Sequence, residues 1–224
     1  MDSRPNLPLD PHFIMNWENR YQTGDMPWEK GAPSPGLVEY LETHPALTGK
    51  ILVPGCGWGH DVRAISRATT PISTELPASV IPGVNKDYEV IGLDIAPSAI
   101  HGAQSFPVVG NERYQLGDLF ELPPEFNQGF DWVWEHTCFC AIHPCLRENY
   151  VRSVAAALKP NGHLLAIFYL TPDHDDSETP PFGVTPAELE SRFRSEFELL
   201  RAWTPGITYP GREGREEMRL FRKK

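Results

Sequence analysis

Seven short apolar segments of the chain have the length and composition of buried strands. They are 51–53, 88–94, 113–120, 130–137, 163–170, 198–204 and 218–222. Segments with helical signals precede the first of them and separate the later ones up to the sixth, except the third from the fourth. The predicted helices are 35–47, one opening near 58–61, 97–105, 145–158 and one from the capping box at Thr185 to Glu196. This alternation predicts an α/β fold with helices on both faces of a seven-stranded, mostly parallel sheet.

The two ends of the chain depart from this alternation. The last two strands are joined only by the Gly- and Pro-rich segment 205–214, so we expect them to close the sheet as an antiparallel pair, with one antiparallel edge strand. At the other end, residues 1–11 hold three prolines and are expected to form a loose arm. Residues 12–31 are dense in aromatic side chains, which favours either a helix packed on the domain or a lid over a ligand. We therefore expect one domain over 1–224, with an arm and lid at 1–34 and an α/β core at 35–224.

Composition narrows the class of protein. Hydrophobic residues make up 40% of the 224 residues, which indicates a globular domain. The net charge of −10 argues against a nucleic-acid partner. No apolar run is long enough to span a membrane, and the start of the chain lacks the apolar region of a signal peptide. A monomeric, cytoplasmic protein that acts on a small molecule is expected.

The four cysteines do not predict a metal site. Cys138, Cys140 and Cys145 lie within eight residues, but they form no C-x-x-C pair and no matching histidine pair accompanies them. Buried, inert thiols are the simpler interpretation, and no metal is expected.

Three glycines at alternate positions follow the first strand. Gly55, Gly57 and Gly59 would let the backbone turn sharply and approach a ligand closely. The Lys of a phosphate-binding loop is missing, and His60 stands where a dinucleotide fingerprint requires Gly or Ala. The spacing G-x-G-x-G is that of S-adenosylmethionine (SAM) methyltransferases, although a simple tight turn is the alternative.

The second predicted strand ends in Asp94, where an acid accepts hydrogen bonds from the ribose hydroxyls of an adenosine. A helix cap is the alternative role, and the two roles are compatible. The interval from Gly59 to Asp94 is longer than usual because of segment 69–86, which is rich in Pro, Ser and Thr and is interpreted as an inserted loop.

Further candidate residues lie at the ends of the later strands. Asp118 either contacts the adenine amino group or is a turn residue. Glu135 and His136 end the fourth strand beside the first, where the strand order is expected to reverse and ligands bind. His136 contacts adenine, acts as a base or is a structural histidine. Tyr169 ends the fifth strand at the same edge.

Four stretches together resemble the thiopurine S-methyltransferase superfamily, and within it the thiol and halide methyltransferases. The first runs from 17–21 to 27–28, and the others are 52–61, 90–94 and 139–142. The likeness extends from about residue 13 to the C-terminus. The resemblance implies SAM contacts at several positions. These are Trp17, Tyr21, Trp28, Gly55, Asp94, Asp118, Leu119 and His136. It also implies that Tyr169 faces the methyl acceptor.

The chain departs from that family pattern at three places. Tyr21 replaces a second Trp, His136 replaces an expected Tyr, and segment 69–86 is additional. These departures bear on the acceptor more than on the cofactor.

The expected reaction is an in-line transfer of a methyl group from SAM to a small soft nucleophile, which yields S-adenosylhomocysteine. Thiols, bisulfide, thiocyanate and halides are such nucleophiles, and Tyr169 or His136 would take a proton from a neutral thiol. Three alternatives stay open: methyl transfer to O or N, SAM binding without transfer, and a nicotinamide-dependent oxidoreductase. The last is disfavoured by His60 and by the closing antiparallel pair.

Overall fold

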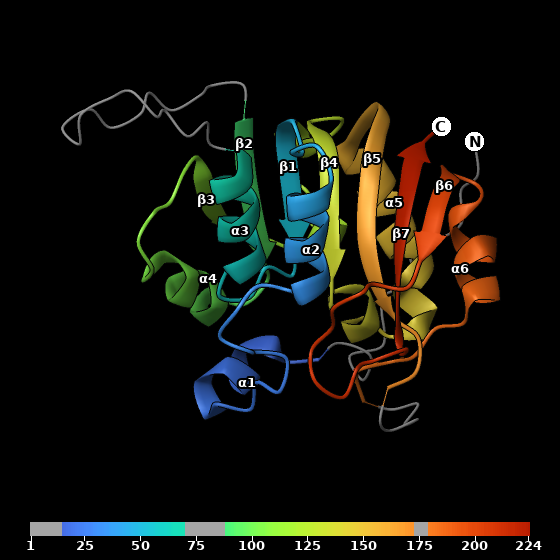
Figure 1. Ribbon diagram of the computed structural model, residues 1–224. Coiled ribbons are helices and arrows are strands. Elements are labelled where there is room, and N and C mark those ends of the chain that lie inside the picture. The colour runs from blue at the N-terminus through green and yellow to red at the C-terminus, as the bar shows by residue number, and fades with distance from the viewer. Residues whose placement is uncertain (1–14, 70–87, 173–178) are drawn as a thin grey trace.

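A single twisted sheet forms the centre of the computed structural model, which describes residues 15–69, 88–172 and 179–224 (Figure 1). Its strands are β1 (Gly49–Pro54), β2 (Tyr88–Asp94), β3 (Glu112–Leu116), β4 (Phe130–His136), β5 (Leu158–Tyr169), β6 (Phe197–Trp203) and β7 (Glu216–Lys223). Their order across the sheet is β3-β2-β1-β4-β5-β7-β6. The first five strands pair in parallel, and β7 pairs antiparallel to both β5 and β6. The strand order therefore reverses between β1 and β4.

Helices cover both faces of this sheet (Figure 1). They are α1 (Trp17–Thr23), α2 (Pro35–Thr43), α3 (His60–Thr69), α4 (Pro97–Gln104), α5 (Arg147–Ala157) and α6 (Pro186–Phe193). Leu37 of α2 and Ile65 of α3 belong to a core on one face, and Val154 of α5 and Phe193 of α6 belong to a core on the other. Two separate cores explain why the second half of β5, from Leu164 to Tyr169, is apolar throughout, since both of its faces are buried.

Helix α1 is set apart from these layers and lies beyond the carboxyl ends of the parallel strands (Figure 1). Its first turn is capped by Asn16, whose Oδ1 accepts a hydrogen bond from the N–H of Asn19 at 3.0 Å. It ends at Gly24, which has the left-handed conformation that glycine adopts without strain. The aromatic N-terminal segment is thus placed at the edge of the sheet where ligands bind in open α/β folds.

The predicted α/β fold with a mixed seven-stranded sheet is confirmed, and its elements differ from the prediction in their bounds. The antiparallel strand β7 lies between β5 and β6 rather than at the edge. Strand β3 ends at Leu116, not at residue 120, because Asp118 caps a short 3-10 helix at Leu119–Glu121. Strand β5 begins at Leu158 instead of His163, because the backbone is already extended at Leu158, directly after α5. The strand contains an irregularity at Asn161, where φ is 62°.

The predicted helices are longer than the observed ones at several ends. Helix α1 covers only Trp17–Thr23 of the aromatic segment 12–31, and α6 stops at Phe193 before Glu196. Short 3-10 turns at Phe139–Ala141 and Pro144–Leu146 precede α5, and another lies at Pro124–Phe126. The arm at 1–11 and nearly all of the insertion at 69–86 lie outside the described residues.

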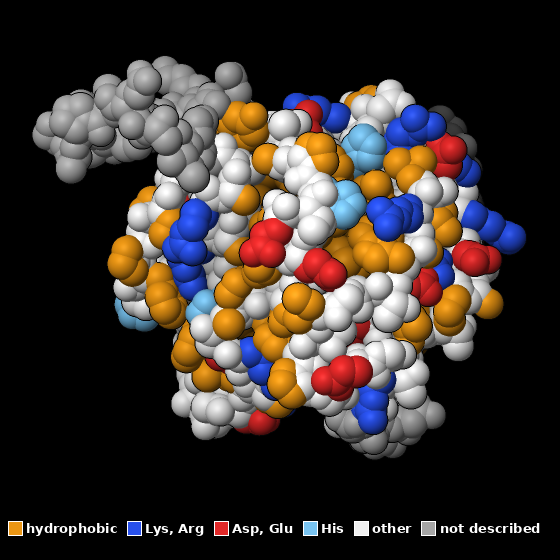
Figure 2. Space-filling model, in the orientation of Figure 1, with side chains coloured by type: hydrophobic (Ala, Val, Ile, Leu, Met, Phe, Trp, Pro, Cys, Tyr) orange, Lys and Arg blue, Asp and Glu red, His pale blue; other side chains and the backbone are white. Residues whose placement is uncertain are grey.

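Charged side chains are dispersed on the face of the molecule seen in Figure 2. Lys and Arg are scattered there among Asp and Glu and do not form one basic patch. Within the described residues, none of the helices combines the length and the apolar character needed to cross a bilayer.

Candidate active site

A cavity of about 290 Å³ opens at the carboxyl ends of the parallel strands, close to the size typical of small-molecule sites. Gly55 follows β1, Asp94 ends β2, and Asp118 follows β3, so residues at the ends of three adjacent strands form one wall of the cavity. The continuation of β4 and the loop before β7 supply the opposite wall. This second wall includes Thr137, Cys138, Cys140, Ile142, His143 and Arg212. The cavity thus spans the point where the strand order reverses, as expected for the binding site of an open α/β sheet.

The glycine loop between β1 and α3 depends on backbone conformations that suit glycine. Gly57 and Gly59 have φ angles of 53° and 72°, in the left-handed region. A Cβ on Gly59 would lie 2.4 Å from the ring of Tyr114, and a Cβ on Gly57 would lie 3.3 Å from the hydroxyl of Tyr21. The loop therefore packs closely against β3 on one side and α1 on the other. Neither glycine lines the cavity itself, whereas Gly55 does.

Asp94 links the glycine loop to the start of α4. Its Oδ2 accepts a hydrogen bond from the N–H of Gly57 at 2.9 Å, and its Oδ1 accepts one from the N–H of Ala96 at 2.9 Å. The carboxyl group is 7% exposed, and this burial raises its pKa against the lowering effect of the backbone donors. Each oxygen can accept a further hydrogen bond. The capping interpretation is wrong in detail, because the N-cap of α4 is Ala96 and no side chain caps the helix. Asp94 instead closes the turn before α4 and stays in the cavity wall.

Asp118 and Leu119 lie beside Asp94 in the same wall. The Oδ1 of Asp118 accepts a hydrogen bond from the N–H of Phe120 at 2.8 Å, so the turn role is confirmed. Leu119 is 8% exposed and presents an apolar surface between the sheet and the cavity. An acid and an apolar side chain in adjacent positions suit a ring with polar edges.

The N-terminal segment contributes an aromatic wall. The Trp28 ring makes T-shaped contacts with the rings of Trp17 and Tyr21, whose centroids lie 5.3 Å and 5.6 Å from its own. Burial raises the pKa of the Tyr21 phenol, and the negative charge of Asp94 raises it further. The guanidinium of Arg20 lies 4.7 Å from the centroid of Trp28. All four side chains line the cavity.

The position of α1 is held by an acid on its first turn. Glu18 accepts hydrogen bonds from the N–H of Ser98 at 2.9 Å and from its hydroxyl at 2.7 Å. Ser98 lies in the first turn of α4, where the helix dipole favours a negative charge. These bonds lower the pKa of Glu18. The same α4 follows Asp94, so α1 is attached next to a carboxylate of the wall formed by β1 to β3.

Two predicted residues of β4 lie behind the cavity and do not line it. Glu135 is fully buried and accepts hydrogen bonds from the N–H of Phe139 at 2.7 Å and from the hydroxyl of Tyr150 at 2.5 Å. His136 has its Nδ1 3.1 Å from Asp61 Oδ2, and its buried Nε2 has no partner within the described residues. The structure thus gives Glu135 a structural environment and leaves one nitrogen of His136 unengaged.

Tyr169 also lies outside the cavity lining, beneath Arg212. The guanidinium carbon of Arg212 is 4.5 Å from the centroid of the Tyr169 ring, and Arg212 Nη1 is 2.9 Å from Glu216 Oε1. Arg212 itself lines the cavity. Sequence patterns did not indicate Arg212, because an Arg in the Gly- and Pro-rich segment 205–214 looks like any other loop residue.

The thiols differ in their exposure. All four cysteines are free, Cys138 and Cys140 line the cavity, and Cys145 is exposed. Burial raises the pKa of the Cys138 and Cys140 thiols, so both are held as neutral groups. No group of three His, Cys, Asp or Glu side chains that could hold a metal occurs in residues 15–69, 88–172 and 179–224.

Comparisons with known proteins agree with this fold. Residues 14–218 match the family model described as thiopurine S-methyltransferase (TPMT). A probable thiol methyltransferase 2 of Arabidopsis thaliana is 28% identical over 92% of this chain and 84% of that protein. A thiocyanate methyltransferase 1 of Brassica oleracea is 32% identical over 78% of this chain and 69% of that protein.

The solved structures show the same fold. The 1,6-didemethyltoxoflavin-N1-methyltransferase of Burkholderia thailandensis, with S-adenosylhomocysteine bound, superposes with a TM-score of 0.64 at 17% identity, covering 92% of this chain and 84% of that one. The fold, the reversal of strand order and these matches define a SAM-dependent methyltransferase. The chain belongs to the thiopurine S-methyltransferase family.

Proposed function

We propose that the cavity binds SAM and that the enzyme transfers its methyl group to a small soft nucleophile: a thiol, bisulfide, thiocyanate or a halide. One observation carries the proposal. Among the described residues that line the cavity, the β1–β3 side holds the two carboxylates, Asp94 and Asp118, whereas the β4–β7 side contributes one guanidinium, that of Arg212, and no carboxylate. A nucleoside and an anion thus have separate complementary surfaces in one cavity.

The residues of the first wall fit SAM. Asp94 would accept hydrogen bonds from the ribose hydroxyls, and Asp118 would accept one from the adenine amino group beside the apolar Leu119. Trp17, Tyr21 and Trp28 would enclose the charged end, since an aromatic face attracts a cation by about 0.5–2 kcal/mol. When bound, SAM supplies a methyl group that the positive sulfonium has already activated.

The residues of the second wall fit a weakly hydrated anion. Cys140, Ile142 and Leu146 make it largely apolar, which favours a soft nucleophile over a strongly hydrated one. Arg212 adds a positive charge, which its ion pair with Glu216 and the Tyr169 ring hold in place. The names of the thiol and thiocyanate methyltransferase relatives support this class of acceptor.

The protein would contribute to the reaction mainly by aligning the nucleophile, the methyl group and the leaving sulfur, and by excluding water. An anionic acceptor carries no proton that must be removed. The predicted base roles of Tyr169 and His136 would apply to a neutral thiol, and they stay predictions.

The direct test is methyl transfer from labelled SAM to bisulfide, thiocyanate, iodide and a small thiol. We expect turnover with at least one of them. Turnover only with O or N acceptors, or SAM binding without any transfer, would contradict the acceptor assignment and leave the methyltransferase fold intact.

Arg212 gives this test a residue-level counterpart. Removing Arg212 alone would leave Glu216 buried without its partner, so both are changed together in Arg212→Met/Glu216→Gln. The KM for the anionic acceptor should rise about tenfold or more, the cost of a lost charged contact. The Kd of S-adenosylhomocysteine should not change. Arg222→Met/Glu198→Gln, at an exposed ion pair on the outer strands, is the matched control.

A further inference from the structure

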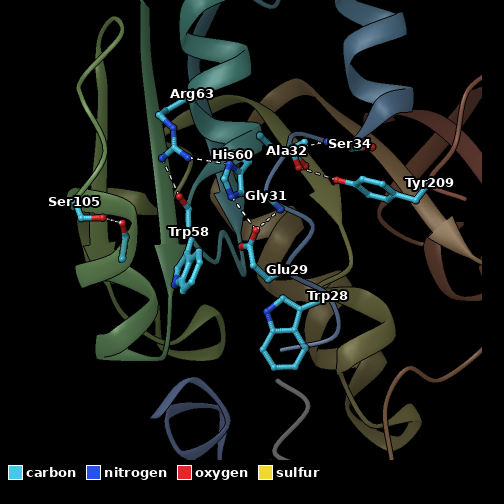
Figure 3. A network of polar contacts seen from close by, with 12 residues as sticks. Trp28, Glu29, Gly31, Ala32, Ser34, Trp58, His60, Arg63, Ser105 and Tyr209 are labelled. Carbon is cyan, nitrogen blue, oxygen red and sulfur yellow. Dashed lines mark hydrogen bonds and ion pairs between the residues drawn. The ribbon is translucent and has the colours of Figure 1, made fainter. Parts of the chain in front are cut away.

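Three side chains form a chain of hydrogen bonds between the start of α3 and the N-terminal segment (Figure 3). Arg63 Nη2 lies 3.0 Å from His60 Nδ1, and His60 Nε2 lies 2.9 Å from Glu29 Oε1. The same oxygen of Glu29 accepts a hydrogen bond from the N–H of Gly31 at 2.5 Å. None of the three side chains lines the cavity. The function proposed above therefore leaves them without a role.

The protonation of His60 follows from its neighbours. A guanidinium only donates hydrogen bonds, so His60 Nδ1 is the acceptor and its Nε2 carries the proton that goes to Glu29. His60 is thus a neutral link, and it requires an acceptor rather than a negative charge at position 29. Arg63 is itself fixed, because it is 8% exposed and donates to the carbonyl of Trp58 at 2.8 Å.

This chain of bonds ends directly next to the aromatic wall. Glu29 follows Trp28, whose indole points away from His60 in Figure 3 and lines the cavity. A second bond holds the far end of the same segment, since the N–H of Ser34 donates to Asp61 Oδ1 at 2.7 Å. The first two residues of α3 therefore hold the backbone on the C-terminal side of Trp28.

We propose that Glu29, His60 and Arg63 are positioning residues that hold Trp28 in the wall of the SAM site. Helix α3 then positions both the glycine loop that precedes it and an aromatic side chain of the cavity wall. The proposal rests on the SAM site proposed above.

The test measures the Kd of S-adenosylhomocysteine by calorimetry with the full-length protein. Glu29→Ala removes the acceptor and should raise the Kd about tenfold. Glu29→Gln keeps an acceptor oxygen for His60 and should stay within about twofold of wild type. His60→Leu interrupts the chain from its other side and should raise the Kd as Glu29→Ala does. The kcat at saturating SAM and the KM of the acceptor should change less than about twofold.

A double variant separates positioning from a general loss of structure. If Glu29 acts through Trp28, adding Glu29→Ala to Trp28→Ala should raise the Kd by less than about twofold beyond Trp28→Ala alone. Glu198→Ala, which removes an exposed carboxylate paired with Arg222, is the control and should bind as wild type does.

Three results would overturn the proposal: a wild-type Kd in both Glu29→Ala and His60→Leu, the same loss in Glu29→Gln as in Glu29→Ala, or full additivity with Trp28→Ala. Failure of wild-type protein to bind S-adenosylhomocysteine would instead overturn the SAM site itself. The two failures are therefore distinguishable.

Discussion

Glu135 illustrates how burial decides the chemistry of a single residue. It ends β4 beside the predicted ligand edge, yet it has no exposed surface and contacts only protein groups. Burial raises its pKa to about 7, although the hydrogen bonds from Phe139 and Tyr150 lower it. A carboxyl group with such a pKa binds a proton in the folded protein that it would release in the unfolded chain.

This shift predicts a pH dependence of stability. Because the folded pKa lies above the unfolded one, the folded state binds more protons between about pH 4.5 and 7. The free energy of unfolding should therefore fall as the pH rises through this window, by up to about 1.4 kcal/mol per pH unit. In Glu135→Gln this component should vanish, and the difference between the two proteins can be measured by urea unfolding at pH 5, 6, 7 and 8. An unchanged difference over this range would show that Glu135 titrates normally.

The loop between β1 and α3 is the element on which the site depends most. Within four residues, from Gly57 to the start of α3 at His60, the chain makes three contacts: Gly57 with Asp94, Gly59 with Tyr114 and His60 with Glu29. Each contact joins the loop to a different part of the chain: β2, β3 and the N-terminal segment. A local distortion of this loop should therefore affect both stability and cofactor binding.

Gly59→Ala is the substitution that tests this element. Its φ of 72° is strained for alanine, and the new Cβ would lie 2.4 Å from the Tyr114 ring. We expect a loss of about 2–4 kcal/mol in the free energy of unfolding. Gly214→Ala is a matched control, because its φ is 70° and its Cβ would meet no atom within 4 Å. Its loss should be only about 1 kcal/mol, and equal losses in the two variants would show that contact with Tyr114 is unimportant.

At the scale of the whole molecule, the cavity depends on segments that are distant in the sequence. Its walls come from the N-terminal segment, the ends of β1 to β4 and the loop before β7. One core reaches the cavity through Leu93 and Leu119, and both cores hold the strands whose ends form it. A ligand bound there contacts most of the fold and should stabilise all of it.

Thermal unfolding measures this coupling. S-adenosylhomocysteine at a hundred times its Kd should stabilise the folded state by about 2.7 kcal/mol and raise the Tm by about 5–10 °C. Asp94→Ala should weaken binding by about 1–3 kcal/mol, as expected for the loss of a charged acceptor, and should lower the shift at the same concentration. An unaltered shift would mean that Asp94 does not contact the ligand.

The fold and one wall of the cavity followed from local patterns. Short apolar runs, helical periodicity, the three glycines and Asp94 are features of adjacent residues, and they predicted the sheet and the edge where it binds ligands. The capping box at Thr185 likewise predicted the start of α6, where Thr185 Oγ1 accepts from the N–H of Glu188 at 3.1 Å. Such signals are readable because a strand end or a helix cap is specified within a few positions.

Tertiary structure alone decided which side chains form the cavity wall on the β4–β7 side. Arg212 lines it from an unremarkable loop, whereas Tyr169 and His136, at strand ends, lie behind its wall. The bond between Glu29 and His60 joins residues 31 positions apart and has no sequence signature. Periodicity determines which face of an element is buried, but the direction of a polar side chain near a strand end depends on neighbours from other elements. The sequence by itself therefore determined the sheet and the position of its site, and only the packing of remote segments decided which residues form the wall on the β4–β7 side and which residues support the site.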